Sequence, residues 1–273
     1  MAPLVKRERS LLFLDSLTPQ YNDVLVEDSD DAPAYVDYFW KVLCGLRSVR
    51  RLESKWIRDD SPFAGHLAKA RKESGGGIWR APFIDFGKFD NWEAYLQSLP
   101  GKLRQGHRRR LRNLQRCGAV EFRMANAESC SSDMAWIFAQ KRQWADRMGK
   151  SDRWIRAPAT EEFFAAAARE GIESGRTWLT VLSVDGATIA ATLAFLDGST
   201  LYGSKDGYDP AWHTYSPGRM LKLLTFERAF QEGIRKIDLM IGGYPWKLEL
   251  ANGMIRVRSR KVRLRQRAKR SIR

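Results

Sequence analysis

The amino-acid sequence predicts a mixed α/β fold, in which a mostly antiparallel sheet contains one parallel pair of strands and is flanked by helices. Two observations lead to this prediction. From residue 177 onward, short apolar runs are joined by Asp-Gly turns, and one longer amphipathic stretch separates two later apolar runs. A helical crossover of that length joins parallel strands, whereas tight turns join antiparallel ones.

The elements after residue 177 are predicted in the order β-β-β-α-β-β-β, with the helix over 217–232 and Gly233 ending it. Strands are expected at 178–184, 188–196, 200–204 and 234–241, and in a hairpin over 246–257 with an Asn252-Gly253 turn. The single parallel pair leaves a natural opening in the sheet, where we expect a ligand to enter.

The region before residue 177 combines helices with short strands. Amphipathic spacing predicts helices over 33–47, 92–99, 102–117, 131–148 and 161–169, the last capped by Thr160. Strands are expected over 78–86, interrupted by Pro82, and over 120–124. Gly118 is placed where a glycine commonly ends a helix.

The net charge of +15 comes from two local segments. Residues 102–116 hold seven Lys/Arg and residues 254–273 hold ten, with no acidic residue in either, so that the remaining chain has 30 basic and 32 acidic residues. Such basic segments suit a nucleic acid, an acidic membrane surface or a phosphorylated ligand, and are also typical of solvated faces and tails.

Composition excludes several other classes. An apolar content of 44% is enough for a packed core and is not that of a disordered chain. No apolar run is long enough for a transmembrane segment or a signal peptide. The three widely spaced cysteines predict reduced thiols in a cytoplasmic protein, and no spacing of ligands predicts a metal site.

Several short sequences, taken in order, resemble one family. They are Ala190-Ala191-Thr-Leu-Ala-Phe195, Tyr208-Asp209-Pro-Ala-Trp212, Tyr215-Ser216-Pro217-Gly218-Arg-Met-Leu221, Gly233, Asp238 and Gly242-Gly243-Tyr-Pro-Trp-Lys247. The pattern resembles bacterial acetyltransferases associated with cellulose biosynthesis, a group within the GNAT superfamily related to the Fem peptidyltransferases. The likeness covers about 88–252 and includes the basic helix. Where such proteins often have tyrosine before the lysine, this chain has Trp246.

The resemblance implies a tandem arrangement of GNAT-like lobes with a truncated first lobe. We predict a partial N-terminal lobe at 1–90, a basic helical connector at 91–127, a C-terminal acyltransferase domain at 128–259 and a basic tail at 260–273. Residues 1–90 resemble only the latter part of the usual N-terminal half. This is expected if translation starts upstream of Met1 or if the first lobe has been lost.

A GNAT-type reaction needs a site for the acyl donor, acetyl-CoA or another acyl-CoA. The free N–H groups and the dipole at a helix N-terminus favour the pyrophosphate of such a donor. Ser216, Gly218, Arg219 and Met220, at the predicted start of the helix, are therefore the candidate cofactor-binding residues, although a Ser-Pro cap also starts ordinary helices. The string Arg-x-x-Gly-x-Gly/Ala of many GNAT proteins is missing from the sequence.

The reaction also needs a base for the acceptor's proton and an acid for the leaving thiolate. Asp238 is the first candidate base, because a carboxylate among apolar residues requires a partner, and His213 is the second. Tyr244 and Tyr208 are candidate acids, and Tyr208 is also a candidate for substrate binding. Lys247 could hold an acidic acceptor or a donor phosphate. Each also has an ordinary interpretation as a surface or strand-end residue.

Arg104 and Arg109, on the basic helix, are the remaining candidates for substrate binding. Arginines on one helix face could hold a nucleotide-sugar diphosphate, a tRNA or a membrane surface. The favoured function is acyl transfer from a thioester to an amine or hydroxyl of a small molecule, sugar or polysaccharide precursor. The alternatives are a Fem-like transferase using aminoacyl-tRNA, and an inactive GNAT-fold partner in a polysaccharide-synthesis complex.

Overall fold

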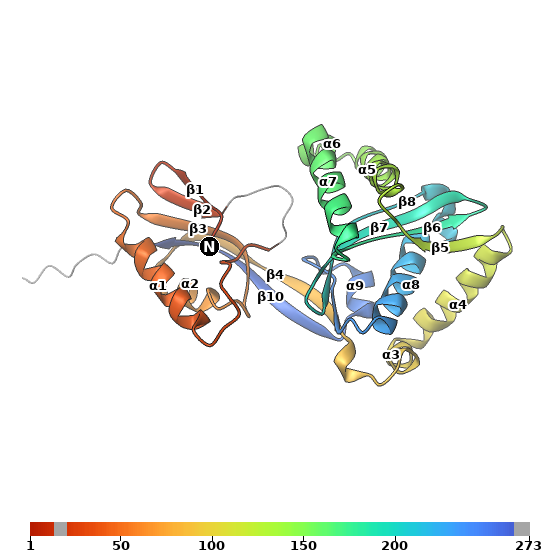
Figure 1. Cartoon of the computed structure of the whole chain (residues 1–273), viewed down its shortest axis with the longest axis horizontal. Coiled ribbons are helices and arrows are strands. Elements are labelled where there is room, and N and C mark those ends of the chain that lie inside the picture. Colours follow the sequence, from red (N-terminus) through yellow and green to blue (C-terminus); the bar gives the residue numbers. More distant parts are fainter. Residues whose placement is uncertain (14–20, 265–273) are drawn as a thin grey trace, which may run out of the picture. The chain divides into compact units, whose positions relative to one another are not determined.

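The structure is a computed structural model that describes residues 1–13 and 21–264 (Figure 1). The predicted tail beyond residue 264 therefore lies outside the described residues. The chain forms two compact units. Unit 1 comprises residues 1–81, 241–243 and the segment from Met254, and unit 2 comprises residues 82–240 and 244–253. The domain boundaries expected from the sequence remain a prediction.

Unit 1 is a small sheet with two helices and a core of its own. Its strand order is β1 (Leu4–Arg7), β2 (Ser10–Phe13), β3 (Arg51–Arg58), β10 (Gly253–Arg263) and β4 (Lys72–Asp85). β2 and β3 are parallel, whereas β1–β2 and β3–β10 are antiparallel. Helices α1 (Ala32–Gly45) and α2 (Ala64–Lys69) bury Val36, Leu43 and Leu67 around the ring of Phe63.

Unit 2 contains a longer mixed sheet. From the last residues of β4, the strand order continues through β9, β8, β7, β6 and β5. The bounds of these strands are β5 Val120–Met124, β6 Thr177–Val184, β7 Ala187–Asp197, β8 Thr200–Tyr208 and β9 Lys236–Asp238. The pair β8–β9 is parallel and the other pairs within unit 2 are antiparallel. The predicted mixed α/β fold with its parallel pair is therefore confirmed.

Helices cover both faces of the unit 2 sheet (Figure 1). On one face, α5 (Cys130–Arg147) and α7 (Pro158–Glu173) pack against Leu179 and Val181 of β6. On the opposite face, α8 (Pro217–Gln231) packs against Trp178 and Leu182 of the same strand. This alternation is the period of two that a β-strand imposes. The other helices are α3 (Trp92–Ser98), α4 (Gly101–Gln115), α6 (Arg153–Arg156) and α9 (Pro245–Leu250), with short 3-10 turns at Phe86–Lys88 and Pro210–Tyr215.

Local signals located most elements correctly. The Asp185-Gly186 turn has φ of 48° and 79°, the left-handed conformation of a tight hairpin. Helix α8 begins at Pro217, and Gly233 follows its end with φ of 76°. Thr160 was wrongly expected to cap a helix, because α7 already begins at Pro158, whose fixed φ suits the first helical position.

The predicted hairpin over 246–257 is wrong. Residues 245–250 form α9, which starts at Pro245, and only the following segment is a strand. Asn252 does not form a turn, because its side chain bridges the backbone of Asp85, accepting from the N–H at 2.8 Å and donating to the carbonyl at 2.9 Å. Gly253 lies against Phe83, where an added Cβ would be 2.2 Å from the ring. Both residues therefore serve tertiary contacts.

We expect Asn252→Ala to lower the free energy of unfolding by about 1–2 kcal/mol, because two hydrogen bonds are lost and two backbone groups lose their partner. Urea denaturation of both proteins measures this difference. Asn113→Ala is the control, since the side chain of Asn113 makes no hydrogen bond within the described part of the chain. Equal losses in the two variants would contradict the role of the bridge.

Candidate functional site

The parallel pairing between β8 and β9 is only three residues long. Thr200, Leu201 and Tyr202 pair with Lys236, Ile237 and Asp238. Beyond Asp238 the chain turns away through Met240, which has a left-handed φ of 64°. Within residues 1–13 and 21–264, the edge of β8 from Gly203 to Tyr208 that faces away from β7 consequently has no strand partner. Its backbone groups lie where the sequence predicted an opening in the sheet.

Asp238 and Lys247 meet at the turn that ends β9. The Asp238 side chain is fully buried, and its carboxylate accepts a hydrogen bond from the Met240 N–H at 2.7 Å. Lys247, on α9, is 7% exposed and donates from Nζ to the Met240 carbonyl at 3.2 Å. Burial, together with the charge of nearby Lys222, lowers the pKa of Lys247 to about 8, against the opposing effect of Asp206 and Asp238.

Asp206, on the unpaired part of β8, forms ion pairs with lysines from both faces of the sheet. Lys222 of α8 lies 3.2 Å from one carboxylate oxygen, and Lys141 of α5 lies 4.0 Å from the other. The positive charge of Lys222, with those of Lys141 and Lys247, holds the pKa of Asp206 well below its usual range. Helices on opposite faces can share one carboxylate because no strand covers this edge.

Lys205 precedes Asp206 and points to the opposite face, toward α5 and α7. It is 6% exposed, and its Nζ lies 4.2 Å from the ring centre of Phe164 and 5.3 Å from that of Trp154. Burial, with the added effect of Lys141, lowers the pKa of Lys205 to about 8. No carboxylate of the described residues forms an ion pair with Lys205. The ammonium group is thus held mainly by aromatic faces.

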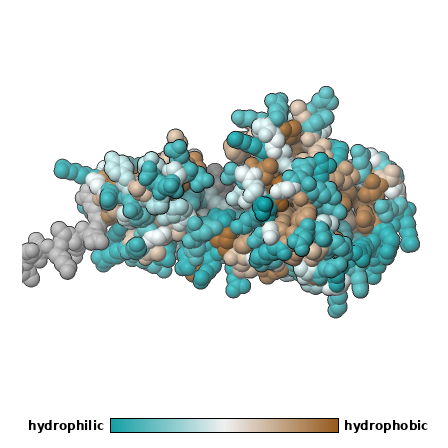
Figure 2. All heavy atoms as spheres, turned by 60° about the horizontal axis from the view of Figure 1, so that its bottom comes forward, coloured by the Kyte–Doolittle hydropathy of each residue, from teal (hydrophilic) through white to brown (hydrophobic). Residues whose placement is uncertain are grey.

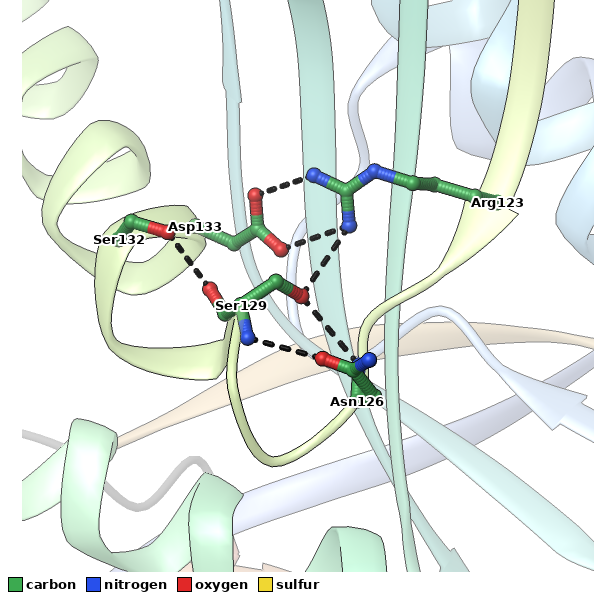
Figure 3. A network of polar contacts seen from close by, with 5 residues as sticks. All are labelled: Arg123, Asn126, Ser129, Ser132 and Asp133. Carbon is green, nitrogen blue, oxygen red and sulfur yellow. Dashed lines mark hydrogen bonds and ion pairs between the residues drawn. The ribbon is translucent and has the colours of Figure 1, made fainter.

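The start of α5 is fixed to β5 by the polar network drawn in Figure 3. Arg123 donates two hydrogen bonds to the carboxylate of Asp133, at 2.9 and 2.7 Å, and a third to the Ser129 hydroxyl at 3.3 Å. Asn126 accepts from the Ser129 N–H at 2.9 Å. Bidentate pairing of this kind fixes geometry, so that the later residues of α5, including Lys141, have a defined position over β8.

The N-terminus of α8 lies beside the far end of β8. Ser216 precedes the helix with φ of 52°, and its side chain makes no capping hydrogen bond. An added Cβ on Gly218 would lie 3.7 Å from the ring of Tyr208. Arg219 pairs with Glu249 of α9 at 2.9 Å, and Met220 is buried in the core. Pro217 has no N–H, and the N–H groups of Arg219 and Met220 both donate to the Ser216 carbonyl at 3.0 Å, so that Gly218 has the first-turn N–H that points out of the helix start.

The remaining predicted residues are His213, Tyr244, Arg104 and Arg109. His213 is exposed and its Nδ1 lies 3.1 Å from the Pro210 carbonyl oxygen, while Tyr244 is exposed at the start of α9 with its ring 5.6 Å from Lys247 Nζ. Helix α4, with Arg104 and Arg109, packs beside the Pro210–Tyr215 turn, and Cys117 just after it contacts the Tyr215 hydroxyl at 3.1 Å.

Four charged residues of this site were missed by the sequence analysis: Lys141, Lys205, Asp206 and Lys222. The expected third strand stopped at residue 204, which assigned Lys205 and Asp206 to a loop, whereas β8 continues to Tyr208. No local signal marked this extension, because Lys205 and Asp206 are two consecutive charged residues and the pairing with β7 shifts register beside them. Lys222 lies within the predicted helix over 217–232, and the helical pattern alone does not show that it reaches Asp206 of β8.

No group of three or more His, Cys, Asp or Glu residues in the described ranges is arranged to hold a metal ion. Among those same residues, no helix combines the length and apolar character needed to cross a bilayer. Figure 2 shows one face of the molecule, largely covered by hydrophilic side chains with smaller hydrophobic groups between them.

The fold and the edge of β8 define a GNAT-like domain. A family model described as acetyltransferase (GNAT) domain matches residues 101–248, more than half of the chain, and the chain belongs to this family. The match begins at the basic helix α4 and ends one residue after Lys247. A comparison with curated protein sequences gives no match.

Solved structures share the fold at low sequence identity. FemX is 12% identical, with a TM-score of 0.65 over 95% of this chain and 83% of that one. L-PGS from Bacillus licheniformis is 12% identical, with a TM-score of 0.57 over 97% of this chain and 81% of that one. A conserved protein of unknown function from Bacteroides thetaiotaomicron is 12% identical, with a TM-score of 0.56 over 92% and 78%. These likenesses establish the fold alone.

The buried Lys247 makes a prediction about pH. Its pKa of about 8 lies below that of an unfolded lysine, about 10.4. Between these values the unfolded chain binds the additional proton, so the contribution of Lys247 to folding becomes more favourable as pH rises. We expect the stability of the wild type relative to Lys247→Met to increase from about pH 7.5 to about pH 10. Urea titrations at several pH values measure this difference, and a constant difference would show that Lys247 titrates normally.

Proposed function

We propose that unit 2 catalyses transfer of an acyl group, most simply acetyl, from an acyl-CoA thioester to an amine or hydroxyl acceptor. The observation that carries this proposal is the unpaired edge of β8 beside the uncapped N-terminus of α8. The edge supplies backbone N–H groups for the thioester carbonyl, and the helix supplies the Gly218 N–H and a dipole for the donor phosphates. Membership of the acetyltransferase (GNAT) domain family supports the same assignment.

The residues at the helix start suit a phosphate group. Gly218 has no side chain between the backbone and Tyr208, so an oxyanion can approach the first turn closely. Arg219 and Lys222 add positive charge on the first two turns, although Arg219 shares its charge with Glu249 and Lys222 shares its own with Asp206. Helix α4, which carries further arginines, packs beside the turn that precedes α8.

The reaction is a direct substitution at the thioester carbon. The lone pair of the acceptor nitrogen or oxygen forms the new bond to the carbonyl carbon, the C–S bond breaks, and CoA leaves as a thiolate that takes up a proton. We assign Lys247 as the general base that takes up the acceptor's proton, since a pKa of about 8 leaves part of its amine neutral near neutral pH. Asp238, fully buried behind the turn, positions Met240. Tyr244 is the exposed candidate for protonating the thiolate.

The acceptor class follows only from the sequence resemblance. Similarity to acetyltransferases associated with cellulose biosynthesis favours a sugar, a polysaccharide precursor or a related metabolite. A cytoplasmic location of the protein would fit the use of acyl-CoA.

Replacing Gly218 by tryptophan should abolish measurable binding of acetyl-CoA, because the indole would occupy the space between the helix start and Tyr208. Thermal denaturation with and without acetyl-CoA measures binding, since a ligand at 100 times its Kd stabilises the native state by about 2.7 kcal/mol. Gly45→Trp is the matched control, at a glycine with no atom within 4 Å of an added Cβ. Normal acetyl-CoA binding by Gly218→Trp would remove the donor site from α8. A folded wild type that binds no thioester would favour the inactive-partner alternative.

The second candidate is an aminoacyl-tRNA-dependent transferase. It is favoured by α4, where Arg109 and Arg112 are exposed and only Arg108 pairs with an acid, Glu93, among the residues described. A row of such arginines suits the phosphate backbone of a nucleic acid.

For this candidate we expect tRNA binding to weaken with salt. The double variant Arg104→Ala/Arg109→Ala should reduce the slope of log K against log salt by about one for each phosphate that the helix no longer neutralises. Filter binding at several NaCl concentrations measures the slope. Arg228→Ala, at an exposed arginine paired with Glu232, is the control. Binding to tRNA that does not depend on α4 would exclude this role for the helix.

A further inference from the structure

Lys205 is a buried cation whose location the proposed donor site does not explain. It lies on the face of the sheet that carries α5 and α7, whereas the start of α8 lies on the opposite face. Its β7 partner, Leu193, packs with α5 and α7, which fixes this direction. An anion that reached Lys205 would therefore approach from the side opposite the donor phosphates.

The charges around Lys205 are unbalanced. Lys141 lies on the same face, and the nearest carboxylate, Asp206, is already shared by Lys141 and Lys222. Burying an ammonium group without a carboxylate is unfavourable, and aromatic rings compensate for only part of that loss. The lowered pKa of Lys205 has the same origin, burial together with the charge of Lys141. A bound anion would supply the missing negative charge.

A second polar group on this face also lacks a partner. The side-chain oxygen of Gln140 is buried and accepts no hydrogen bond within the described residues. Gln140 packs over Gly207, two residues beyond Lys205 on the same side of β8, where an added Cβ would be 2.9 Å from the Gln140 Cβ. The glutamine is thus fixed in place with an acceptor atom available for an N–H or O–H group of a ligand.

We propose that Lys205 and Lys141 bind the acceptor through an anionic group, a carboxylate or a phosphate, while the Gln140 side-chain oxygen accepts from an N–H or O–H group elsewhere on the same molecule. This inference rests on the proposed function, since it assigns a class of acceptor to the same reaction. The anion lies on the α5 and α7 face, and the group to be acylated reaches the thioester around the unpaired edge of β8. Phe164 and the half-buried ring of Trp154 form the apolar wall beside the anion.

The test is a calorimetric titration of the full chain with inorganic phosphate and, separately, with acetate, each with and without saturating CoA. We expect anion binding that Lys205→Met and Lys141→Met each weaken about tenfold or more, the loss of one charge-assisted hydrogen bond. Neither variant should change the affinity for CoA. Lys236→Met is the matched control, since Lys236 Nζ also lies over a ring, 4.1 Å from the centre of Phe83, at a different strand.

The two probes distinguish the sources of the anion. Binding of phosphate alone indicates a phosphorylated acceptor, and binding of acetate as well indicates a carboxylate. Unchanged anion affinity in both lysine variants, or no anion binding by the wild type, would overturn the inference. Loss of CoA binding with anion binding retained would instead count against the proposed donor. Should Lys205→Met fail to fold, Lys141→Met decides the question.

Discussion

The short parallel pairing of β8 with β9 is the constraint on which the rest of unit 2 depends. If β9 continued beside Gly203–Tyr208, the backbone N–H and C=O groups of that edge would be hydrogen-bonded to β9. Lys141 and Lys222 could not then reach Asp206 from opposite faces, as they do at 4.0 and 3.2 Å. The turn at Met240, stabilised by the buried carboxylate of Asp238, ends the pairing. A fully buried acid therefore acts on the site through backbone geometry.

The same region of unit 2 contains a group of lysines close together. Lys141, Lys222 and Lys247, from three different helices, act on the charge of Asp206, and Lys205 precedes it on β8. Lys205 and Lys247 are almost completely buried. Isolated buried charges destabilise a fold unless partners or ligands compensate them. Here the contacts of the two buried lysines include aromatic rings and one backbone carbonyl. The burial of Lys205 without an ion pair to any described carboxylate is the observation behind the proposed binding of an anionic acceptor.

Sequence reasoning succeeded where a local cause decides the structure. Asp185-Gly186 fixes a tight turn, and Pro217 and Gly233 bound a helix, through the intrinsic conformational preferences of those residues. It failed where a distant partner decides. Asn252-Gly253 has the composition of a turn, yet Asp85 and Phe83 determine its conformation. The extension of β8 through Lys205 and Asp206 depends on β7, including an irregularity at Leu193/Ala194 that no local pattern reveals.

The division of the chain has a consequence for the order of folding. Unit 1 takes its strands from both ends of the described sequence, and unit 2 is inserted between β4 and β10. During synthesis the strands β1 to β4 emerge first, but their sheet lacks β10 until the inserted unit has also left the ribosome. The inserted unit has continuous chain for almost all of its sheet and can form earlier. By holding the ends of β4 and β10 close together, the inserted unit would reduce the loop-closure entropy that the N-terminal sheet must overcome.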